Sequence, residues 1–116
     1  MVRHKPAWTV QPAMRVIVAG PDERDIAAAI EAEGHEVARV DVANRPALEE
    51  AGVLEAGAYV LTEVRQATSI PVALDLNEGL KVVVYDTESL PDFARGQADL
   101  VVDPELLGPD AVAAEL

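Results

Sequence analysis

The feature that most constrains this fold is an apolar segment that runs into a glycine. Residues 14–20 read Met-Arg-Val-Ile-Val-Ala-Gly, which is typical of the first strand and phosphate turn of a dinucleotide-binding unit. Asp41 follows about 20 residues later, where such units carry the acid that binds the ribose. The segment therefore predicts a parallel α/β domain.

The glycine pattern of this turn is incomplete. The second and third glycines of G-x-G-x-x-G are replaced by Asp22 and Asp25, so only Gly20 remains. Those glycines let a pyrophosphate approach bare backbone, and a carboxylate in their place blocks and repels it. We interpret Asp22 as a cap that fills the N–H donors of the next helix. The alternative keeps an anion site at this helix N-terminus.

Apolar segments alternate with helical patterns along the rest of the chain. Continuous or alternating apolar runs predict strands at 16–19, 36–40, 58–61, 81–85 and 98–102. Helical spacing and capping residues predict helices at about 22–33 (beginning at Pro21 or Asp22), at 46–51, from 69 onward, at 90–95 and at 109–116. This order predicts a Rossmann-like α/β fold, with a parallel sheet of about five strands and helices on both faces. The alternation of Val37 and Val40 with polar residues places the second strand near an edge.

The chain of 116 residues is long enough for one domain, which we assign to residues 14–116. Residues 1–13 carry Arg3, His4, Lys5 and Trp8, no acid and no periodic pattern. We expect them to be a flexible N-terminal extension. The alternative is a basic arm that docks on the acidic body or on a second subunit.

The charge of the chain is strongly acidic, with 21 Asp and Glu against nine Lys and Arg and a net charge of −12. This charge opposes binding to nucleic acid or to an anionic membrane. The acids are dispersed and only two residues are lysine, which is typical of a halophilic surface; an acidic face for a basic partner is the alternative. No apolar run approaches the roughly 20 residues of a membrane span, so we expect a cytoplasmic protein without membrane insertion.

Residues that carry catalysis or bind metals are scarce. The chain has no cysteine, its only histidines are His4 and His35, and no triad or metal-binding pattern is present. A phosphoacceptor receiver domain is also excluded, because Thr62 stands where the third strand would end in the acceptor Asp. These observations predict a protein that is not an enzyme and holds no metal.

Four segments together carry a resemblance to a known family. They are residues 48–58 (Leu-Glu-Glu-Ala-Gly-Val-Leu-Glu-Ala-Gly-Ala), 59–62 (Tyr-Val-Leu-Thr), 81–85 (Lys-Val-Val-Val-Tyr) and 97–104 (Gln-Ala-Asp-Leu-Val-Val-Asp-Pro). From Met14 to about Asp110 the chain resembles the N-terminal RCK (TrkA-N) domain that regulates potassium channels and transporters. The resemblance implies a dimeric domain that binds NAD(H) or adenine nucleotides. It would place Gly20 at the phosphate turn, Asp41 at the ribose and Thr62 near the nucleotide.

The chain departs from this family at the glycines and beyond Thr62, where Thr68 is nearest to the usual asparagine. It is also similar to small haloarchaeal proteins, some of which carry the name CTP synthetase. That activity needs a G-x-x-x-x-G-K-[ST] loop and a cysteine nucleophile, and the sequence has neither.

We therefore expect a non-enzymatic regulatory or interaction module on a degenerate NAD-binding fold, without a cofactor. It would act as a homodimer or by docking a protein partner. Ile26, Ile30, Leu48 and Val53 are aliphatic residues that form either the dimer surface or the core. The alternative is a sensor of NAD or an adenine nucleotide that uses Asp41 and Thr62.

Overall fold

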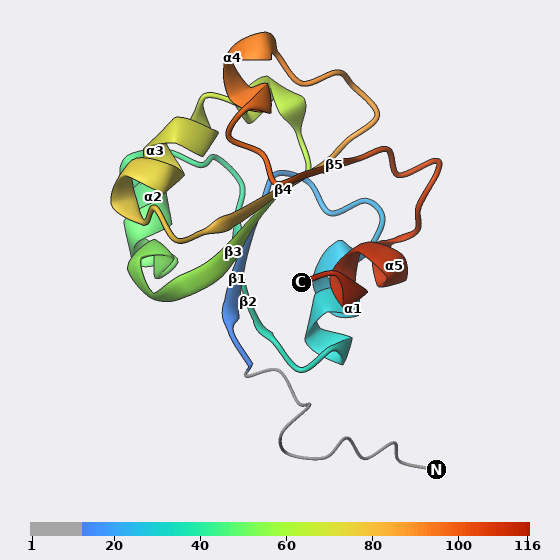
Figure 1. Ribbon diagram of the computed structural model, residues 1–116. Coiled ribbons are helices and arrows are strands. Elements are labelled where there is room, and N and C mark those ends of the chain that lie inside the picture. The colour runs from blue at the N-terminus through green and yellow to red at the C-terminus, as the bar shows by residue number, and fades with distance from the viewer. Residues whose placement is uncertain (1–12) are drawn as a thin grey trace.

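The computed structural model describes residues 13–116, which form a five-stranded sheet between two helical layers (Figure 1). All neighbouring strands are parallel and their order is β2-β1-β3-β4-β5. The strands are β1 (Arg15–Ala19), β2 (Glu36–Val40), β3 (Ala56–Leu61), β4 (Lys81–Tyr85) and β5 (Leu100–Val102). The predicted Rossmann-like α/β fold is confirmed.

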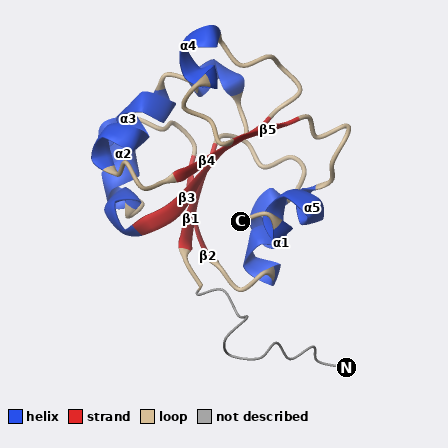
Figure 2. Cartoon of the chain, viewed as in Figure 1, coloured by secondary structure: helices blue, strands red, loops and turns tan. Residues whose placement is uncertain are grey.

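Helices cover both faces of the sheet. They are α1 (Ile26–Ala32), α2 (Arg45–Glu50), α3 (Ser69–Leu76), α4 (Asp92–Arg95) and α5 (Pro109–Ala114), with short 3₁₀ turns η1 (Val53–Glu55) and η2 (Val64–Gln66). Figures 1 and 2 show α1 and α5 together on one face and α2, α3 and α4 on the other. No helix of the described residues is long and apolar enough to cross a membrane.

The central strands are buried on both faces, and this explains their continuous apolar sequence. In β1, Ile17 packs in the core beneath α2 and α3, whereas Val16 and Val18 pack in the core beneath α1 and α5. In β2, only Val40 is fully buried, and the strand lies at the edge of the sheet as predicted.

The structure corrects the start of the first helix. Residues 22–25 form a turn, and α1 begins at Ile26 rather than at Pro21 or Asp22. Asp25 adopts a left-handed conformation with φ of 59°, so a right-handed helix cannot continue back through it. The last strand and α4 also begin two residues later than predicted, at Leu100 and Asp92.

The four candidate aliphatics of the dimer surface belong to the core. Ile26, Ile30, Leu48 and Val53 are each at most 1% exposed, so they contribute to the interior and not to an interface. The predicted N-terminal extension lies outside the described residues, apart from Ala13.

Candidate functional site

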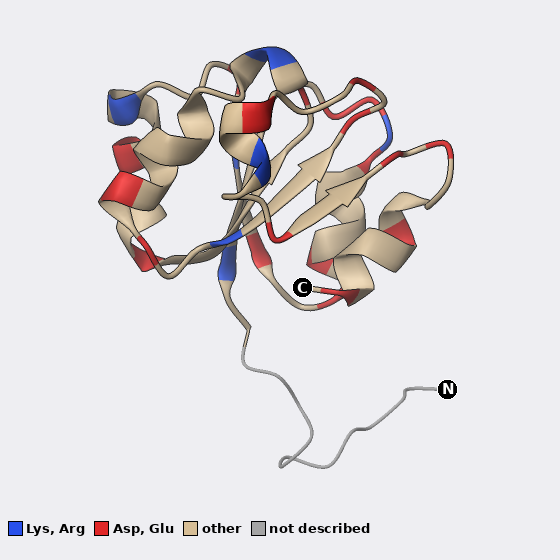
Figure 3. Cartoon of the chain, turned by 45° about the horizontal axis from the view of Figure 1, so that its top comes forward, with Lys and Arg blue, Asp and Glu red and all other residues tan. Residues whose placement is uncertain are grey.

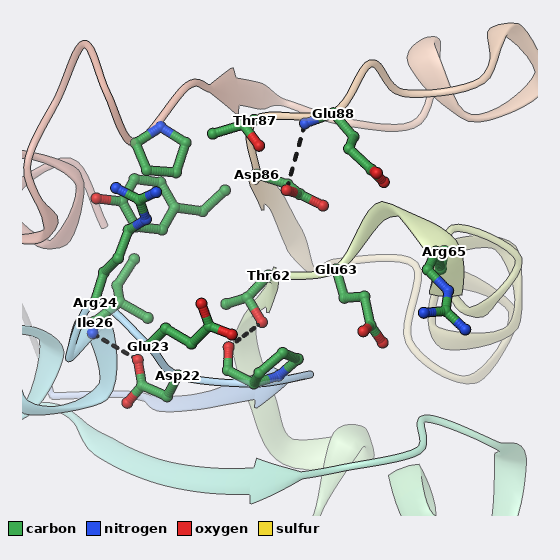
Figure 4. Close-up of a pocket in the computed structure, with 13 residues that line it drawn as sticks. Asp22, Glu23, Arg24, Ile26, Thr62, Glu63, Arg65, Asp86, Thr87 and Glu88 are labelled. Carbon is green, nitrogen blue, oxygen red and sulfur yellow. Dashed lines mark hydrogen bonds between the residues drawn. The ribbon is translucent and has the colours of Figure 1, made fainter.

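The carboxyl ends of β1, β3 and β4 surround a cleft of about 270 Å³ (Figure 4). The strand order reverses at this point: β2, which follows β1 in the chain, lies on one side of β1, and β3 lies on the other side. Doubly wound sheets bind ligands at such a point. Most of its lining residues come from the segments that follow these strands and β5, and the others from the start of α1, from η2 and from the end of β4. They are Pro21, Asp22, Glu23, Arg24, Ile26, Thr62, Glu63, Arg65, Tyr85, Asp86, Thr87, Glu88 and Pro104.

Gly20 forms the turn that leaves β1. Its φ is +101°, and its N–H donates to the carbonyl oxygen of Val40 at 2.9 Å. A Cβ at this position would lie 2.6 Å from the hydroxyl oxygen of Thr62. The glycine is therefore required by the backbone conformation and by close contact with the end of β3, whether or not a phosphate binds here.

The Asp22 side chain caps α1. Its Oδ1 accepts a hydrogen bond from the N–H of Ile26 at 2.7 Å, and its Oδ2 accepts one from the N–H of Ala27 at 3.3 Å. The predicted capping role is confirmed, although Asp22 acts across a four-residue turn rather than at the first position before the helix. These two donors already have an anionic partner from the chain itself.

The Thr62 hydroxyl ties β3 to the turn after β1. Its oxygen lies 3.1 Å from the carbonyl oxygen of Ala19 and 2.5 Å from that of Pro21, and the Thr62 N–H also donates to Ala19 at 2.9 Å. A hydroxyl has one hydrogen to donate, so both carbonyls compete for it. Thr62 therefore holds the wall of the cleft, and only its lone pairs remain to accept a bond from a ligand.

Asp41 lies outside the cleft. It follows β2 as an exposed residue, and its backbone carbonyl accepts a hydrogen bond from Gln66 Nε2 at 2.8 Å. Gln66 also accepts a bond from the N–H of Ala43 at 2.8 Å, so it fixes the loop after β2. Arg45, four residues further along the chain, pairs with Asp75 at 2.6 Å and not with Asp41. The structure thus brings Gly20, Asp22 and Thr62 together and leaves Asp41 apart.

The segment after β4 completes the cleft, and none of its residues is among the predicted site residues. Asp86 Oδ2 accepts a hydrogen bond from the N–H of Val64 at 2.7 Å, and Thr87 and Glu88 extend the same wall. The signal was available: parallel strands end at the same edge of a sheet, so polar residues that follow β4 meet those that follow β3.

The cleft is rich in charge of both signs. Five carboxylates (Asp22, Glu23, Glu63, Asp86 and Glu88) and two guanidinium groups (Arg24 and Arg65) line it. Within residues 13–116, none of these seven side chains takes part in an ion pair. Burial raises the pKa of Tyr85 in the same wall, with the Arg24 charge acting in the opposite direction. The tyrosine is therefore a neutral hydroxyl group near neutral pH.

A parallel five-stranded sheet with a cleft at its switch point defines a doubly wound, Rossmann-like α/β domain. The chain belongs to DUF7126, a family of unknown function, whose sequence profile matches residues 16–116.

Two further comparisons bear on the chain. A comparison with curated proteins finds no sequence match. Among solved structures, the chain is similar to a "putative pilus assembly-related protein" from Burkholderia pseudomallei, with a TM-score of 0.61 and 18% identity. The similarity covers 88% of this chain and 85% of that one, and at this identity it supports the fold alone.

Proposed function

We propose that this chain is a non-enzymatic regulatory or interaction module on a degenerate NAD-binding fold, which acts by self-association or by docking a protein partner. The observation that carries the proposal is the Asp22 carboxylate on the first N–H groups of α1. A phosphate at this position would meet a like charge at about 4 Å, which costs on the order of 4 kcal/mol at an effective dielectric of about 20.

The resemblance to N-terminal RCK domains supports a regulatory module. The strand order does not add to this resemblance. The order 2-1-3-4-5 is the flavodoxin-like order of doubly wound sheets, whereas dinucleotide-binding domains have the order 3-2-1-4-5-6. Both orders place a switch point beside the first strand, where ligands bind.

A nucleotide sensor that uses Asp41 and Thr62 has less support from the geometry. Asp41 is not part of the cleft, and the Thr62 hydroxyl already contacts two carbonyl oxygens. We therefore treat nucleotide binding as the outcome that would overturn the proposal.

The test is thermal unfolding in molar KCl with NAD, NADH, ATP, ADP, AMP or CTP. A ligand at about 100 times its Kd adds roughly 2.7 kcal/mol to the free energy of unfolding, so binding is readily seen as a higher Tm. We expect no shift for the natural chain. A shift with one of the adenine ligands, lost in Asp41→Ala, would replace the proposal by a sensor function.

The matched variant is Asp22→Gly combined with Asp25→Gly, which restores the glycine pattern. A Tm shift with NAD in this variant alone would show that the two carboxylates exclude the nucleotide. At 1 M salt, charges more than about 3 Å apart are largely screened. If NAD still gives no Tm shift at this salt concentration, long-range repulsion is not the reason.

A further inference from the structure

We draw no further inference here: the strongest candidate, the exposed apolar side chains of Phe93 on α4, Val101 on the edge strand β5, and Leu106 and Leu107 in the segment after it, lies on a surface whose acidic residues are spread over both helical layers (Figure 3), and nothing in the structure shows what covers it.

Discussion

Replacing Asp22 by alanine should destabilise the protein, because it removes the cap of α1. The cap consists of a short bond to the N–H of Ile26 at 2.7 Å and a longer one to the N–H of Ala27 at 3.3 Å. Loss of a capping side chain typically costs about 0.5–2 kcal/mol, and a hydrogen bond to a charged group contributes about 1.5–3 kcal/mol. Asp22 is half-buried, so water reaches the exposed donors only in part.

We expect a loss of about 1.5 kcal/mol in the free energy of unfolding, near the overlap of these two ranges. With about 2.1 cal/mol/K per residue, 116 residues have an unfolding entropy of about 0.24 kcal/mol/K, so Tm should fall by about 6 °C. The assays are urea unfolding for the free energy and thermal unfolding for Tm, both followed by circular dichroism at fixed, molar KCl.

Two variants separate the cap from the charge. Glu23→Gln removes a neighbouring carboxylate that makes no hydrogen bond within the described residues, and it should leave stability within about 0.5 kcal/mol of the natural chain. Asp22→Asn keeps an acceptor oxygen and should lose less than Asp22→Ala. If Asp22→Ala is as stable as Glu23→Gln, Asp22 does not hold the α1 donors in solution, and these donors are then free to bind a phosphate.

Three further predictions concern the turn after β1 and the polar pair inside the core. Gly20→Ala should lower the free energy of unfolding, measured in urea, by about 2–3 kcal/mol, because the φ of Gly20 is +101° and a Cβ there would lie 2.6 Å from the Thr62 hydroxyl oxygen. The control is Gly96→Ala, whose Cβ would have no heavy atom within 4 Å and which should lose no stability. Ser69→Ala should lower the free energy of unfolding by more than Tyr59→Phe does in the same assay. The reason is that it removes Ser69 Oγ, which lies 2.7 Å from the buried Tyr59 hydroxyl, and so leaves that hydroxyl without a partner. Equal losses in the two variants would contradict this prediction. Burial raises the pKa of Tyr59 from 10.0 to about 12, so the folded state holds this proton more tightly than the unfolded state. The free energy of unfolding should therefore fall as pH rises from about 10 to about 12. Tyr59→Phe should flatten this part of the curve of unfolding free energy against pH.

The strands are the elements that the sequence predicts best. The bounds of β2 and β4 agree with the prediction, and those of β1 and β3 extend it by one and two residues. In β4, three consecutive valines are fully buried between the two helical layers, so the pattern that defines the strand does not depend on which helix covers it. The capping role of Asp22 was predictable for a similar reason, because an aspartate before a helix finds its donors a few residues along the same chain.

The start of α1 and the role of the aliphatic residues were not predictable in this way. Asp25 is left-handed only because the chain turns between Asp22 and Ile26, and its side chain makes no capping bond that would reveal this. Ile26 and Leu48 form an apolar helix face, but periodicity does not distinguish a face that packs on a sheet from one that packs on a second molecule. The sheet covers both residues.

The sequence by itself therefore determined the class of fold, the succession of strands and helices, and the loss of the glycines from the phosphate turn. Each of these depends on residues that are close together in the chain. Only the tertiary structure decided that β3 lies beside β1 on the side away from β2, which brings Thr62 and Glu88 to one cleft and leaves Asp41 outside it. The physical reason is that strand order is set by packing between segments tens of residues apart, and local patterns carry no information about which segments those are.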